Sequence, residues 1–182
     1  MSLLSQLKES KNKLRGTTTS VRTPGGEIFN ETRSASGEVI TNKIGFGVGF
    51  VIDLKPDLQV TTVTPGLLMG SQDVTQDIKL LQINKVTDIL SIGVQVDTFD
   101  EFNYHFFNAL DLPEFNLIDV FENCCALIDR IKSKEGVVYV HCNAGVSRSA
   151  SVVIAYLMKV ERFSFIKAYN YLRSLRPSIC KL

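Results

Sequence analysis

The chain has 182 residues and a mass of 20.2 kDa, and 45% of its residues are apolar, so we expect one well-filled domain with an extension rather than two full domains. Its 20 Lys and Arg against 19 Asp and Glu give a net charge of +1, which argues against a global basic field for nucleic acid or an anionic membrane. The 2 His residues exclude a metal site built on three histidine ligands.

The four cysteines are not spaced as a zinc site or a disulfide framework; they are Cys124, Cys125, Cys142 and Cys180. No apolar run approaches the ~18 residues of a membrane span, and Lys8 interrupts the start of the chain too early for a secretory signal. We therefore expect a protein of the cytoplasm or the nucleus, with free thiols and no membrane contact.

The first fifty-odd residues carry weak signals. Leucine spacing predicts a short helix over 1–16, and Thr23-Pro24-Gly25-Gly26 predicts a turn or loose hairpin within 17–42. The glycines of 43–57 predict a flexible joint or a kinked strand. We expect 1–57 to be an N-terminal extension.

From residue 58 the pattern becomes regular. Strands are predicted over 58–62, 86–92, 105–110 and 136–140, and helices over 71–84, 116–132, 149–160 and 164–175. Strands that alternate with helices predict an α/β fold.

The chemistry is concentrated in HCNAGVSRS, residues 141–149, which lies between a predicted buried strand and a predicted helix. A loop of five residues between Cys142 and Arg148 can wrap its backbone N–H groups around a tetrahedral oxyanion. Gly145 permits a positive φ, and the helix presents its positive N-terminus to the same anion.

The positive helix N-terminus and the nearby Arg148 predict a thiolate at Cys142, because a cysteine at a helix N-terminus beside a cation has a lowered pKa. Arg148 can bind two phosphate oxygens through its planar fork. Ser149 can hydrogen-bond the sulfur, and His141 is expected to orient the loop rather than act as a base. The alternative, in which Cys142 is a buried core thiol, does not require Gly and Arg at these offsets.

The motif resembles the signature H-C-x5-R-[ST] of the cysteine-dependent protein tyrosine phosphatases, and more narrowly the loop H-C-x-A-G-x-S-R-S of the dual-specificity phosphatases. PGLLMGS at 65–71 looks like the approach to that family's first helix, VTDIL at 86–90 like its V-T-H-I-L strand, and RPSI at 176–179 like its R-P-x-I turn. Asp88 stands where the family usually has His. The resemblance covers about 58–179, and the terminal family helix that would follow is not recognisable.

The resemblance implies a central mixed β-sheet of about five strands flanked by helices, with the phosphate-binding loop between a buried strand and a helix. Within 58–182, the expected catalytic domain, it implies attack by Cys142, with no metal or organic cofactor. The residues expected to bind the substrate phosphate are Asn143, Ala144, Gly145, Val146, Ser147 and Arg148.

A general acid must protonate the leaving oxygen. The family's acid loop matches DLPEFN at 111–116, so Asp111 is the first candidate and Glu114 the reserve. Asp119 falls inside a predicted helix, while Asp97 and Asp100 precede a strand. The competing role for Asp111 is a helix cap or a solvated loop carboxylate.

By resemblance, the substrates are phosphoproteins carrying phosphotyrosine, phosphoserine or phosphothreonine, above all kinases of a mitogen-activated cascade. The Trp-Pro-Asp acid loop of the large tyrosine-specific relatives is impossible in a chain without Trp, and the loop lacks the lysines of phosphoinositide phosphatases. The alternative is a weakly active or inactive scaffold that binds phosphoproteins through the same loop. The oligomeric state and a disulfide from Cys142 to Cys124, Cys125 or Cys180 stay open.

Overall fold

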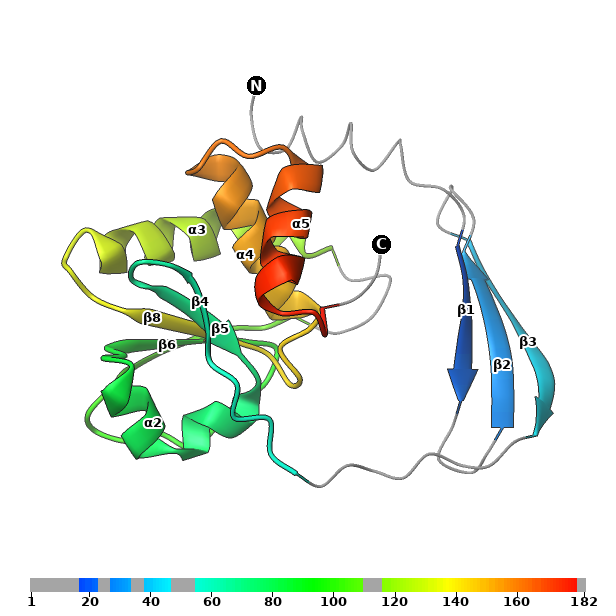
Figure 1. Ribbon diagram of the computed structural model, residues 1–182, viewed down its shortest axis with the longest axis horizontal. Helices are drawn as coiled ribbons and strands as arrows, with labels where there is room; N and C mark the ends of the chain where they lie inside the picture. Colours follow the sequence, from blue (N-terminus) through cyan, green and yellow to red (C-terminus); the bar gives the residue numbers. More distant parts are fainter. Residues whose placement is uncertain (1–16, 23–26, 34–37, 47–54, 110–115, 180–182) are drawn as a thin grey trace. The chain divides into compact units, whose positions relative to one another are not determined.

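A computed structural model describes residues 17–22, 27–33, 38–46, 55–109 and 116–179. The chain divides into two compact units, Met1–Lys55 and Pro56–Leu182 (Figure 1). The helix predicted over 1–16, the acid-loop candidates Asp111 and Glu114, and Cys180 lie outside the described residues.

The first unit contains a three-stranded antiparallel sheet in the order β1-β2-β3. Its strands are β1 (Thr17–Arg22), β2 (Glu27–Arg33) and β3 (Val39–Phe46). Strands β1 and β2 pair antiparallel on either side of the predicted turn Thr23-Pro24-Gly25-Gly26, which itself lies outside the described residues. Residues 43–46 extend β3, because the β-branched Val39, Ile40 and Thr41 favour a strand that continues to Phe46.

The second unit is built on a mixed five-stranded sheet in the order β4-β5-β8-β6-β7, which confirms the predicted fold class. Its strands are β4 (Thr61–Thr64), β5 (Leu67–Gly70), β6 (Asp88–Ile92), β7 (Asn103–Phe107) and β8 (Val138–His141). Only the hairpin of β4 and β5 is antiparallel, and Gly66, with φ 78°, makes its turn possible. The central strands β5, β6 and β8 are buried along their whole length, as expected for parallel strands covered on both faces.

Helices cover both faces of this sheet (Figure 1). On one face lie α3 (Ile118–Lys132), α4 (Arg148–Lys159) and α5 (Phe165–Leu175), each close to its predicted position. The apolar stripe of α3 packs inward, and α4, which packs against β5, β8, α3 and α5, is buried over most of its length.

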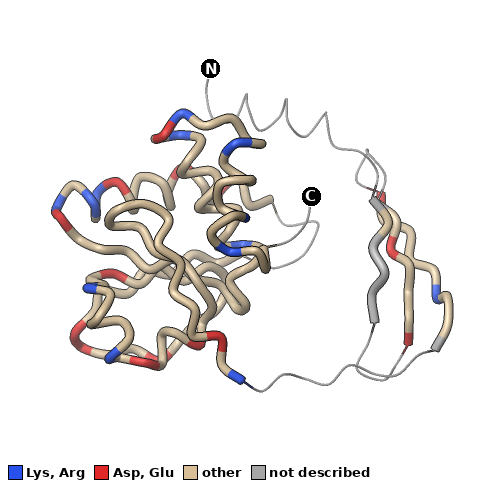
Figure 2. Tube along the Cα trace, in the orientation of Figure 1, with Lys and Arg blue, Asp and Glu red and all other residues tan. Residues whose placement is uncertain are grey.

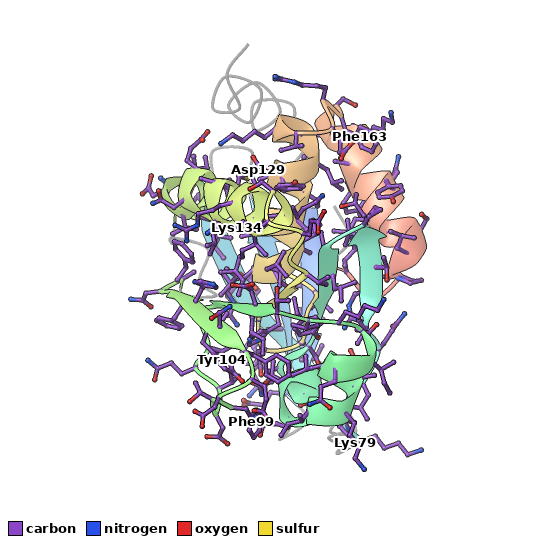
Figure 3. The ribbon with its side chains drawn as sticks, turned by 90° about the vertical axis from the view of Figure 1, so that its left-hand side faces the viewer. Lys79, Phe99, Tyr104, Asp129, Lys134 and Phe163 are labelled. Carbon is purple, nitrogen blue, oxygen red and sulfur yellow. The ribbon has the colours of Figure 1, made fainter. Side chains whose placement is uncertain are left out.

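The other face is covered by a shorter helix. The single helix predicted over 71–84 is wrong, because Asp77 divides it into a 3-10 turn, η1 (Gln72–Gln76), and α2 (Ile78–Ile83). Beneath them lies an apolar cluster that includes Leu81, Ile89 and Tyr139, with Phe99 and Tyr104 packed at its edge (Figure 3). Strand β5 differs from the expectation, because PGLLMGS resembles the approach to a helix whereas its residues Leu67–Gly70 form a strand.

Both signs of charge occur on each side of the sheet of the second unit, with Lys and Arg more frequent along α4 and α5 and Asp and Glu more frequent on the side of α2 (Figure 2). Within the described ranges, no helix is long and apolar enough to cross a membrane.

Candidate active site

The predicted motif lies at the carboxyl end of the central strand. Strand β8 ends at His141, α4 begins at Arg148, and residues 142–147 form the loop between them, which we call the 142–147 loop. Parallel neighbours β5 and β6 end beside it, at Gly70 and Ile92. Ligand sites in α/β sheets form at this edge of the strands.

Carbonyl groups of the 142–147 loop are held by donors outside it. Gln72 N–H donates to Asn143 O at 2.9 Å, and Ser151 N–H donates to Ser147 O at 2.8 Å. Arg176 donates to Ala144 O and Gly145 O at 3.1 and 2.9 Å. These carbonyls are bonded outward, and two N–H groups of the same backbone, those of Gly145 and Ser147, reach the Cys142 thiol, as in an anion nest.

The loop packs tightly on the end of β5. Gly145 has φ 67°, and a Cβ atom at this position would lie 2.3 Å from the Gly70 carbonyl oxygen and 2.8 Å from the Ser71 nitrogen. Glycine is therefore required here by both the backbone conformation and the lack of space.

The thiol of Cys142 lies inside this loop and is 2% exposed. Burial raises its pKa, but hydrogen bonds from the Ser149 hydroxyl, with Sγ and Oγ 3.2 Å apart, and from the N–H groups of Ser149, Gly145 and Ser147 outweigh burial and hold the pKa below its ordinary value.

The other two described cysteines behave in the opposite way. Cys124 and Cys125, on the buried side of α3, are free thiols, and burial raises the pKa of each to about 12. The lowered pKa of Cys142 is therefore a property of its loop and not of burial in this fold.

His141 is fully buried beneath the loop. Its Nε2 lies 2.7 Å from Ser91 Oγ, and its Nδ1 lies 3.3 Å from the Cys142 carbonyl oxygen. Burial lowers the pKa of His141 to about 4, so the ring is neutral at pH 7, donates from Nδ1 to the carbonyl and accepts from the Ser91 hydroxyl at Nε2. Sequence reasoning missed Ser91, because its contact with His141 spans fifty residues of chain.

Arg148, the first residue of α4, is 7% exposed. Its Nη1 donates to the carbonyl oxygens of Gly93 and Ala109 at 3.0 and 3.3 Å. Gly93 follows β6 and Ala109 follows β7, so Arg148 joins the ends of two strands to the start of the helix.

Sequence reasoning gave no role to Arg176, although it quoted the RPSI turn. The Arg176 side chain is 0% exposed, and its guanidinium binds the 142–147 loop from outside. An arginine directly before the proline that follows a predicted helix was the available signal in the sequence, whereas its burial and its partners are visible only in three dimensions.

The other acid candidates that the structure describes are Asp97, Asp100 and Asp119. Asp97 and Asp100 lie between β6 and β7, and Asp119 is in the first turn of α3, where it accepts from Asn116. Among the residues that the structure describes, no three His, Cys, Asp or Glu side chains form a group that would hold a metal ion.

Comparison with known proteins agrees with this geometry. A family profile described as "Dual specificity phosphatase, catalytic domain" matches residues 67–182. Mouse dual specificity protein phosphatase 19 is 43% identical over 176 residues, which cover 94% of this chain and 80% of that protein.

Solved structures give the same result. The crystal structure of DUSP15 is similar with a TM-score of 0.64 at 30% identity, over 66% of this chain and 78% of that one. A mouse dual specificity phosphatase solved with zinc tungstate has a TM-score of 0.64 at 25% identity, over 74% and 84% of the two chains. The chain belongs to the dual-specificity protein phosphatases.

Proposed function

We propose that the enzyme hydrolyses phosphotyrosine and phosphoserine or phosphothreonine in proteins through a phosphocysteine intermediate formed on Cys142. The observation that carries this proposal is the lowered pKa of the Cys142 thiol inside a loop whose N–H groups converge on it. A thiolate is the nucleophilic form of cysteine, and the same N–H groups suit the equatorial oxygens of a phosphate.

In the first step, the Cys142 sulfur attacks phosphorus, forming the S–P bond while the bond from phosphorus to the substrate oxygen breaks. Loop N–H groups and Arg148 stabilise the negative charge on the equatorial oxygens. Residues 143–147 supply the loop backbone for this contact. Asp111 is assigned to protonate the leaving oxygen.

In the second step, water attacks phosphorus, and Asp111 accepts its proton. The S–P bond breaks, inorganic phosphate leaves, and Cys142 returns to the thiolate. The Ser149 hydroxyl, 3.2 Å from the sulfur, stabilises the departing thiolate. His141 is neutral and bound to the Cys142 carbonyl, so we assign it to orientation of the loop.

The nucleophile is tested by Cys142→Ser with para-nitrophenyl phosphate as substrate. We expect turnover to fall at least about 10³-fold, because a serine hydroxyl is not ionised at neutral pH, while tungstate still binds. Cys125→Ser is the matched control and should keep the turnover of the folded wild-type enzyme. Undiminished hydrolysis by Cys142→Ser would overturn the assignment.

The ionisation of the thiol is tested in the wild type. Alkylation of Cys142 by iodoacetamide should reach half its maximal rate at a pH below about 8.5, the ordinary thiol value.

The general acid is tested by Asp111→Asn beside Glu114→Gln. For a phosphotyrosine peptide we expect kcat to fall about 10²-fold in Asp111→Asn and to be nearly unchanged in Glu114→Gln, since only the acid protonates a poor leaving group. The reverse ranking would assign the proton to Glu114.

The physiological substrates are proposed to be kinases of a mitogen-activated cascade, encountered in the cytoplasm or nucleus. The family supports phosphoprotein substrates in general, and the choice of kinases rests on the sequence resemblance alone. Capture of phosphoproteins from lysate by the Cys142→Ser variant, followed by dephosphorylation with the wild type, identifies them. Phosphoprotein capture by a wild-type enzyme without turnover would favour the scaffold alternative.

A further inference from the structure

Arg176 is a fully buried cation, and its charge needs compensation. A guanidinium has five N–H donors, and this one meets acceptors on all of its nitrogens. The Nε and Nη2 groups donate to the loop carbonyls of Gly145 and Ala144. The other bonds go to Asp57 Oδ2, at 2.5 Å from Nη2, and to Gln59, whose backbone and side-chain oxygens are each 3.4 Å from Nη1.

Asp57 is held in place independently of Arg176. Its N–H donates to Asp73 Oδ2 at 2.8 Å, and its carbonyl accepts from Ser71 Oγ at 2.7 Å. Its second carboxylate oxygen accepts from Gln59 N–H at 3.1 Å. The carboxylate is therefore a fixed partner for the guanidinium, although its side chain is 43% exposed.

The segment that fixes Asp57 also supports the 142–147 loop. Ser71 precedes Gln72, whose N–H donates to Asn143 O, and Gly70 contacts Gly145. Arg176 binds the next two carbonyls, Ala144 and Gly145. Three consecutive carbonyls of the loop are thus bound by Gln72 and Arg176, and Asp57 contacts both Arg176 and Ser71, the neighbour of Gln72.

We propose that Asp57 is a positioning residue of the active site, which acts through Arg176 to keep the N–H groups of the 142–147 loop directed at the substrate phosphate; this inference rests on the proposed function. Without the carboxylate, the Arg176 charge is uncompensated and the guanidinium moves toward water. The carbonyls of Ala144 and Gly145 then lose their donors, and the loop no longer has one fixed orientation. Asp57 and Gln59 precede residue 67, where the family match begins, so part of the active-site support lies upstream of the matched segment.

The test uses the full chain with Asp57→Ala, Asp57→Asn and Asp57→Glu, and Asp100→Asn, an exposed carboxylate between β6 and β7, as the matched control. We expect Asp57→Ala to weaken tungstate binding about tenfold and to shift the alkylation profile of Cys142 to higher pH, since a charged hydrogen bond has been removed. Asp57→Glu should restore most of both properties, Asp57→Asn should be intermediate, and Asp100→Asn should match the wild type. Arg176→Lys, which keeps the charge but cannot bridge five acceptors, should resemble Asp57→Ala.

Tungstate affinity and the alkylation profile do not require turnover, so they separate this inference from the proposed function. Weaker tungstate binding together with an alkylation profile shifted to higher pH in Asp57→Ala supports the inference, even if no phosphopeptide is hydrolysed. Wild-type tungstate affinity and an unshifted alkylation profile in Asp57→Ala overturn it, even if the wild-type enzyme is active. If Asp57→Ala does not fold, Asp57→Asn is compared with Asp57→Glu. Equal tungstate affinities and equal alkylation profiles in these two variants overturn the inference.

Discussion

At the scale of single residues, steric exclusion fixes the position of the 142–147 loop. Gly145 shows this most directly, because its φ of 67° and the Gly70 carbonyl oxygen 2.3 Å from a Cβ atom both exclude a side chain. The side chain at 145 would touch no substrate. Its effect on catalysis would come entirely from displacement of the loop against β5.

Gly145→Ala should therefore lose oxyanion binding together with stability. A left-handed alanine alone costs about 1–2 kcal/mol, and the contact with Gly70 adds to this cost unless the loop moves. We expect tungstate affinity to fall at least about tenfold and the melting temperature to decrease. Gly45→Ala, in β3, is the control, since a Cβ atom at Gly45 would have no other atom within 4 Å, and it should leave both values unchanged. Wild-type tungstate affinity in Gly145→Ala would show that the loop adapts to the side chain.

At the scale of elements, residues 71–84 form two elements with different structural roles, η1 and α2. The turn η1 carries Gln72, which holds Asn143 of the loop, whereas α2 covers the far face of the sheet. Asp77 stands between them, and its Oδ1 accepts from Leu80 N–H at 2.9 Å to cap α2. The cap is a property of α2 and makes no contact with the loop that carries Cys142.

Asp77→Ala should reduce stability without changing the thiol. Loss of an N-cap costs about 1 kcal/mol, which corresponds to roughly 4 °C in melting temperature for a domain of this size. Thermal unfolding measures this shift, and alkylation of Cys142 should keep its wild-type pH profile. Asp100→Ala removes a carboxylate that caps no helix and should melt as the wild type. A changed alkylation profile in Asp77→Ala would mean that η1 and α2 act as one element.

The same region shows how far the sequence predicts the structure. Helices α3, α4 and α5 follow from apolar periodicity, and the 142–147 loop follows from its motif, because these signals are local. Strand β5 was missed because a four-residue apolar run has no periodicity that separates a strand from the start of a helix. The contacts of Asp57 with Arg176 and of Ser91 with His141 were missed because they join residues 119 and 50 positions apart. Such partners depend on the strand order, which the sequence pattern does not specify.

At the scale of the whole molecule, the unit that starts at Pro56 contains every described contact of the active site. We propose it as the catalytic domain, close to the predicted start at 58. The family match begins later, at Leu67, which is the first residue of β5. A boundary there removes β4 from the sheet as well as Asp57 and Gln59.

Strand β4 is tied to the helical layer as well as to β5. Tyr171 of α5 donates to Val63 O at 2.6 Å, and Lys132 of α3 donates to Thr64 Oγ1 at 3.1 Å. Val63 itself is 1% exposed, so its removal also takes apolar surface out of the core. Without β4, the buried strand β5 becomes an open edge, which favours aggregation.

We therefore predict that a fragment of residues 56–182 keeps the catalytic properties of the full chain and that a fragment of residues 67–182 does not. The longer fragment should match the full chain in tungstate affinity and, within about twofold, in kcat/KM for para-nitrophenyl phosphate, because the described contacts that hold the 142–147 loop lie within it. The shorter fragment should aggregate or melt at a lower temperature and bind tungstate at least about tenfold more weakly. Size-exclusion chromatography, thermal unfolding and tungstate titration of the three proteins make the comparison. Equal melting temperature and affinity in the 67–182 fragment would show that β4 and Asp57 are dispensable, whereas a loss already in the 56–182 fragment would assign a supporting role to residues 1–55.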